Sequence, residues 1–193
     1  MKNKLKIITL SISLLSVHSF AEVKNTSTKE SKIGWTGSLG LGFHASSLDL
    51  SDSSKVSSFT GIASSFKLGY NFTEEFSLYY VRNASWYTQD VPYLLGDTKE
   101  ETFVSGITGI GVSYYFSPTN PALYAGLAVG LGDYTNVTQN SVDIGMAVMA
   151  TLGYEFAPHW QGELSLLNTS IDGTHENTID STSLQVLINY AWY

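Results

Sequence analysis

Residues 142–156 read VDIGMAVMATLGYEF and alternate with a period of two. The even positions, from Val142 to Phe156, are all apolar or aromatic, whereas the odd positions are mostly small or polar. Successive side chains of a strand point to opposite faces, so this alternation predicts a strand with one continuous apolar face. The segment is longer than the five or six residues typical of a soluble strand, and long enough to cross a bilayer at a tilt. We therefore interpret it as one strand of a transmembrane β-barrel.

The N-terminus has the composition of a secretory signal peptide. Lys2, Lys4 and Lys6 form a positively charged start, residues 5–17 are largely apolar, and Ser19-Phe20-Ala21 supplies the small residues that signal peptidase requires. The run is too short for a membrane-spanning helix. We expect residues 1–21 to be a cleaved signal peptide, 22–32 a short polar periplasmic tail, and 33–193 the outer-membrane barrel domain.

Composition excludes several classes of protein. The sequence has no cysteine, so neither a disulfide scaffold nor a lipid-anchored cysteine is expected. Without residues 1–21 the chain has 7 Lys and Arg against 17 Asp and Glu, a net charge of about −10. An acidic chain without a basic cluster is a poor nucleic-acid binder. No metal-ligand spacing of His or Cys occurs, so we expect no metal and no cofactor.

Seven further segments show comparable alternation. The eight expected strands are 33–45, 59–70, 76–88, 102–116, 122–132, 142–156, 160–169 and 182–192. Short turns follow the second, fourth and sixth, whereas long polar loops follow the others, as in bacterial outer-membrane barrels with short periplasmic turns. The fold class predicted is therefore all-β, an eight-stranded antiparallel up-and-down transmembrane β-barrel. The last strand should pair with the first, since an open edge would leave unpaired backbone groups in hydrocarbon.

Aromatic residues gather beside the short-turn end, as expected of a girdle at one membrane interface. The predicted girdle comprises Trp35, Tyr70, Tyr114, Phe116, Tyr154, Phe156, Trp160, Tyr190 and Trp192, with Phe76 and Tyr124 nearby.

Signal peptide, eight alternating strands and an aromatic last strand together resemble the small OmpA-like outer-membrane β-barrel family. The resemblance implies location in the outer membrane, surrounded by its lipid bilayer and lipopolysaccharide. It also implies assembly by the barrel-assembly machinery, which reads the C-terminal strand; Tyr190 and Trp192 have the required parity and Tyr193 is one residue beyond it. The peptidoglycan-binding domain of some relatives is missing, so we expect no tether to the cell wall.

Several charges are expected to point into the barrel. Lys67, Glu155 and Glu163 lie close to short turns and should share a layer near the periplasmic end. The third strand has an unclear phase: if Arg82 faced lipid, the cost at the midplane would be about 2–4 kcal/mol. We expect Arg82 to face the lumen, by the opposite phase or through a bulge. Since side chains fill so narrow a lumen, these charges should pair and form a static plug rather than a gated ion path.

His44 and Asp143 should face inward near the outer rim. With serines nearby, a nucleophile–base pair is conceivable there, as in lipid-modifying barrel enzymes. No motif supports it, and we expect no enzyme. His159 and His175 fall in a periplasmic turn and an outer loop, away from this place.

The outer loops are acidic. Their carboxylates are Asp49, Asp52, Asp90, Asp97, Glu100, Glu101, Asp133, Asp172, Glu176 and Asp180. Carboxylate oxygens suit hard divalent cations, which would bridge them to anionic lipopolysaccharide. We expect a non-catalytic barrel with a plugged lumen that presents these loops for surface interaction or envelope integrity. The alternatives are a narrow, porin-like channel for small solutes or an apolar ligand, and a lipid-modifying enzyme.

Overall fold

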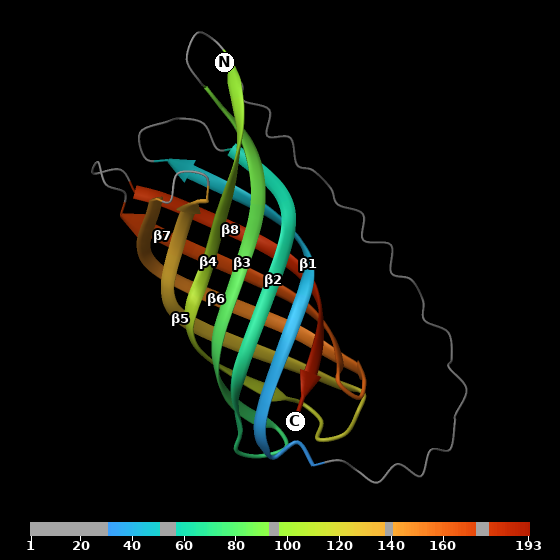
Figure 1. Ribbon diagram of the computed structural model, residues 1–193. Coiled ribbons are helices and arrows are strands. Elements are labelled where there is room, and N and C mark those ends of the chain that lie inside the picture. The colour runs from blue at the N-terminus through green and yellow to red at the C-terminus, as the bar shows by residue number, and fades with distance from the viewer. Residues whose placement is uncertain (1–30, 51–56, 93–96, 138–140, 173–177) are drawn as a thin grey trace, which may run out of the picture. The chain divides into compact units, whose positions relative to one another are not determined.

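The computed structural model describes residues 31–50, 57–92, 97–137, 141–172 and 178–193. The signal peptide, most of the tail, Asp52, His175 and Glu176 lie outside these residues. Eight strands form one closed barrel (Figure 1): β1 Gly34–Leu50, β2 Ser57–Asn71, β3 Phe76–Pro92, β4 Thr98–Tyr115, β5 Ala122–Asn136, β6 Ser141–Ala157, β7 Trp160–Asp172 and β8 Thr178–Trp192. The predicted fold class is confirmed. No helix among the described residues is long and apolar enough to span a membrane.

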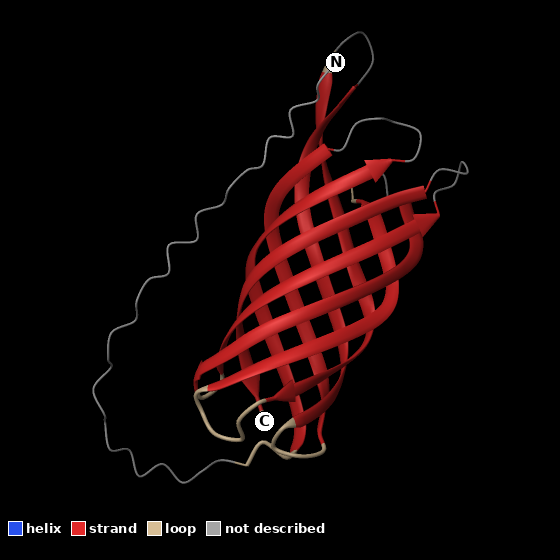
Figure 2. Cartoon of the chain, turned by 180° about the vertical axis from the view of Figure 1, so that it is seen from behind, coloured by secondary structure: helices blue, strands red, loops and turns tan. Residues whose placement is uncertain are grey.

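Each strand pairs antiparallel with the next, and β8 closes the barrel against β1. Following register partners once around the barrel from Gly37 returns to β1 at Ser47, ten residues nearer the loop end. A stagger of this size tilts eight strands by about 40° from the barrel axis. Figure 2 shows this tilt, with the described turns gathered at the end where the C-terminus lies.

The two faces of the wall differ as the alternation predicts. On β6, Val142, Ile144 and Met146 are more than half exposed, whereas the inward-facing Ala147 and Met149 are buried. All nine residues of the predicted girdle are exposed and outward-facing near the short-turn end. Tyr124, in contrast, points inward and is 2% exposed. The apolar outer face suits lipid, and the interior is filled by side chains.

The strands extend further at the loop end than the alternation predicts. Toward the loop end, the pairing of β2 with β3 ends where Ile62 lies opposite Trp86. The pairing of β4 with β5 ends where Phe103 lies opposite Asn136. Beyond these points β3 and β4 pair with each other, so that their ends form a two-stranded ribbon above the rim (Figure 1). The loop predicted at 89–101 is therefore wrong, because most of it is strand.

Candidate functional site

The centre of the lumen is an ion pair between β2 and β7. Lys67 Nζ lies 2.5 Å from Glu163 Oε2, and the Glu163 side chain is fully buried. The same carboxylate accepts hydrogen bonds from the Tyr124 hydroxyl at 2.8 Å and the Ser165 hydroxyl at 3.0 Å. A buried charge is tolerated when it is paired and its remaining lone pairs are satisfied, and Glu163 meets both conditions.

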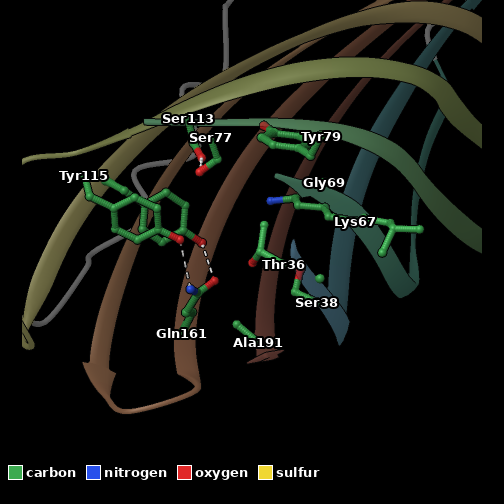
Figure 3. Close-up of a pocket in the computed structure, with 13 residues that line it drawn as sticks. Thr36, Ser38, Lys67, Gly69, Ser77, Tyr79, Ser113, Tyr115, Gln161 and Ala191 are labelled. Atoms are coloured by element: carbon green, nitrogen blue, oxygen red, sulfur yellow. Dashed lines mark hydrogen bonds between the residues drawn. The ribbon is translucent and has the colours of Figure 1, made fainter. Parts of the chain in front are cut away.

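Aromatic rings fill the space below this pair. Lys67 Nζ lies 5.4 Å from the centroid of the Tyr79 ring, and Gln161 bridges the hydroxyls of Tyr115 and Tyr124 (Figure 3). The cavity that these side chains line has a volume of about 30 Å³, room for about two water molecules. Side chains therefore pack closely in this layer of the interior.

A second ion pair closes the periplasmic end. Lys32 Nζ lies 2.6 Å from Glu155 Oε2, and both side chains are buried. The ammonium also lies 4.8 Å from the Tyr115 ring centroid and 5.4 Å from that of Tyr193, a cation–π arrangement. The Tyr193 hydroxyl donates to the other oxygen of Glu155 at 2.9 Å. Lys32, Glu155 and Tyr193 therefore form a floor beneath the barrel.

The backbone before β1 is fixed to the same floor. The amide of Lys32 donates to Glu74 at 3.1 Å, and its carbonyl accepts from the Asn71 side chain at 2.6 Å. Burial and the adjacent Glu155 carboxylate raise the pKa of Tyr193 to about 12. Lys32 was predicted to lie in the polar tail and not in the interior. Nothing in the sequence around a single lysine at this position indicates that it is buried.

A hydrogen-bonded chain crosses the lumen nearer the outer rim. Nδ1 of His44 lies 2.7 Å from Ser46 Oγ, and Ser46 and Ser85 are each 2.9 Å from Ser183 Oγ. Gln185 donates to Ser85 at 2.9 Å, and the other nitrogen of His44 lies 3.1 Å from the carbonyl of Trp86. These five side chains are 7% exposed or less. They join β1, β3 and β8 through the interior.

Four stacked rings line the interior at the level of the ribbon. Centroid distances are 4.7 Å for Phe59–Tyr87, 5.8 Å for Tyr87–Phe103 and 5.6 Å for Phe103–Tyr134. Interplanar angles of 18°, 19° and 28° make the rings nearly parallel across four successive strands. Together with the two ion pairs and the serine chain, they place packed side chains at successive levels of the interior.

The predicted orientation of Arg82 toward the lumen is wrong. The register of β3 has no break, and Arg82 shares the outward parity of Leu78 and Tyr80, which are both 43% exposed. It points away from the lumen and forms an ion pair with Asp133 of β5, Nη2 lying 2.9 Å from Oδ2. The pairing offsets the cost of a lone charge in hydrocarbon, about 2–4 kcal/mol. The predicted lumen cluster of Lys67, Arg82, Glu155 and Glu163 thus loses one member, and its remaining members form two layers.

His44 and Asp143, the other predicted candidates, contact different partners. Asp143 is the register partner of Tyr134 on β5, whereas the hydrogen bonds of His44 within the described chain go to Ser46 and Trp86. Ser46, the hydroxyl nearest to His44, is buried. Among the described residues, no group of three His, Cys, Asp or Glu side chains could hold a metal ion.

A closed eight-stranded barrel with an apolar outer wall, an aromatic girdle and a polar interior defines an integral outer-membrane protein. The sequence profile of the outer membrane protein beta-barrel domain matches residues 7–191, and the chain belongs to this family. The protein is thus an outer-membrane β-barrel protein. No curated protein matches the sequence.

Solved structures of small barrels share this fold. Ail, the attachment invasion locus protein of Yersinia pestis, is 14% identical with a TM-score of 0.51, covering 82% of this chain and 99% of that one. Neisserial surface protein A is 15% identical with a TM-score of 0.52, covering 81% of this chain and 96% of that one. At these identities the likeness concerns the fold alone.

Proposed function

We propose that the protein is a non-catalytic barrel whose closed lumen makes it a rigid support for acidic segments at the cell surface. The observation that carries the proposal is the succession of interior layers, from the Lys32–Glu155 floor through Lys67–Glu163 to the stacked rings. An interior with ion pairs and stacked rings at successive levels favours display over transport. A barrel cross-linked in this way holds its outer ribbon in a fixed position.

The ribbon supplies the surface for interaction. Asp90, Asp97 and Glu100 are exposed there, whereas Glu101 is buried and accepts a hydrogen bond from Asn136 at 2.6 Å. We infer that the exposed carboxylates bind the phosphates of lipopolysaccharide through divalent cations, since hard cations prefer oxygen ligands. The protein would thereby contribute to the integrity of the envelope.

Export and assembly belong to the same proposal. A cleaved peptide at 1–21 would deliver the chain to the periplasm, with the residues before the floor as a short tail. The barrel-assembly machinery would then read the C-terminal strand, on which Tyr190 and Trp192 are exposed on the outward face.

The test is binding of lipopolysaccharide to the refolded protein in phosphatidylcholine vesicles, with and without Ca²⁺. The variant Asp97→Asn/Glu100→Gln should weaken the Ca²⁺-dependent part of binding. The control Glu74→Gln/Glu75→Gln removes the same charge at the periplasmic turn and should leave binding unchanged. Equal binding by both variants, or binding indifferent to Ca²⁺, would contradict the proposal.

A further inference from the structure

The outer wall carries an ion pair that lies across β4. Arg82 reaches from β3 and Asp133 from β5, and Arg82 Nη1 is 3.4 Å from the Thr108 hydroxyl of β4. At Gly106, also on β4, an added Cβ would lie 2.7 Å from Arg82 Nη1. The two charged groups therefore meet directly over the small outward residues of β4. We call Arg82, Asp133, Gly106 and Thr108 the charged strap.

The charged strap begins at the depth of the hydrocarbon. Arg82 is six residues above Phe76, the first residue of β3. With a rise of about 3.3 Å per residue and a tilt of about 40°, its Cα lies about 15 Å above that end, beyond the middle of an apolar band about 25 Å tall. By the same rise, Asp133, eleven residues above Ala122, lies about 28 Å above its end of β5, at the outer edge of that band. Neighbouring outward side chains are apolar, such as Ile110 and Leu131 at 62% and 56% exposed. In the described part of the wall, no other charged side chain points outward at this depth.

Such a group in a membrane usually faces protein rather than lipid. An anionic lipid headgroup suits the charged strap poorly, because Asp133 already neutralises Arg82. The pair is also incompletely covered within one chain, with side chains 33% and 18% exposed. These observations favour a protein surface with complementary polarity as the cover.

We propose that the charged strap is the centre of a two-fold interface between two copies of this chain. The axis of a symmetric dimer in a membrane runs along the membrane normal, and the same patch of both copies meets on it. With the axis at β4, the rotation places β3 of one copy opposite β5 of the other. Arg82 then faces the partner subunit's Asp133, and the reverse contact forms at the same time.

The surface at the axis suits close approach. Gly106 and Thr108 are small, and small residues allow membrane-embedded elements to approach closely. The opposite charges flank them on the two neighbouring strands, so the patch is complementary to its own copy. Both ion pairs, which are partly exposed in one chain, are covered by protein when the copies associate. The inference does not depend on the proposed function, since it concerns the wall and not the loops.

Disulfide cross-linking tests this interface cleanly, because the sequence contains no cysteine. Thr108→Cys and Ile110→Cys place a thiol near the axis, and Ile110→Cys leaves every polar contact of the charged strap in place. The matched control is Val186→Cys on β8, four strands away around the barrel, where the side chain is outward-facing and 58% exposed. Oxidation in native outer membranes should give several-fold more covalent dimer for the two β4 variants than for the control.

Adding Arg82→Leu to Ile110→Cys should abolish this excess, and Arg82→Lys should retain part of it because the charge remains without the planar donors. Heat-modifiable migration in gels confirms that each variant is folded. The wild type, which needs no substitution, should sediment as a dimer in mild detergent. Equal cross-linking at β4 and β8, cross-linking of β4 only to a protein of another mass, or a purely monomeric wild type would overturn the proposal.

Discussion

Lys67 and Glu163 form a buried ion pair although their strands share no backbone hydrogen bonds. β2 pairs with β1 and β3, whereas β7 pairs with β6 and β8. The contact passes through the lumen and joins parts of the wall that are separated by β8 and β1 in one direction around the barrel and by β3–β6 in the other. The interior is thus part of the scaffold.

Removing one partner of this pair should be costly. Lys67→Met leaves Glu163 charged and buried, and we expect a loss of about 3–5 kcal/mol in the free energy of unfolding. The double variant Lys67→Met/Glu163→Gln has no unpaired charge and should recover most of the loss. Urea unfolding in lipid vesicles, followed by tryptophan fluorescence, measures both. If single and double variants were equally unstable, the pairing would not be the source of the effect.

Gly153 tests whether the aromatic packing around Glu163 is tight. A Cβ at this position would overlap the ring of Tyr124, whose hydroxyl donates to Glu163. Gly153→Ala should destabilise the barrel by about 1–3 kcal/mol through overpacking. Gly162→Ala on the neighbouring strand is the control, because its Cβ would meet no atom within 4 Å. Equal stability of the two variants in the same urea assay would show that Tyr124 moves freely.

Tyr193 should make the stability of the floor depend on pH. Its pKa is about 12 in the folded protein, above the value of about 10 expected when unfolded, so the folded state retains the proton longer. The contribution of Tyr193 is complete below pH 10 and is lost as pH rises toward 12. Wild type should exceed Tyr193→Phe in urea midpoint at pH 8, and the difference should shrink at pH 11.5. A difference in urea midpoint that does not change with pH would mean that the Tyr193 hydroxyl does not stabilise the fold by donating a hydrogen bond to Glu155.

Much of the fold follows from the sequence because a membrane imposes it. Hydrocarbon favours apolar residues at the outward positions of a crossing strand, and the alternation at 142–156 shows this preference directly. Above the membrane outward residues need not be apolar, so the strands there do not show the alternation. The ribbon ends at 89–92 and 98–101 therefore have the composition of a loop although they are paired strands.

The lumen could be predicted only in part. Inward parity identifies Lys67 and Glu163, but which charges meet depends on the stagger of the strands, which a single strand's pattern does not contain. The orientation of Arg82 was predicted wrongly for the same reason. Its partner Asp133 lies 51 positions away in the sequence and becomes a neighbour only through the register across β4. Lys32 precedes the first strand, so no alternation marks it as buried.

The central claim is that the lumen is closed, and single-channel conductance of the refolded protein without residues 1–21 tests it most directly. Planar bilayers should be compared for wild type, Lys67→Ala and Glu155→Ala, each checked for folding by heat-modifiable migration. We expect no stepwise conductance for the wild type, and leakage or loss of stability in the variants, where one ion pair is broken. A steady conductance in the wild type would contradict it and would make the protein a channel.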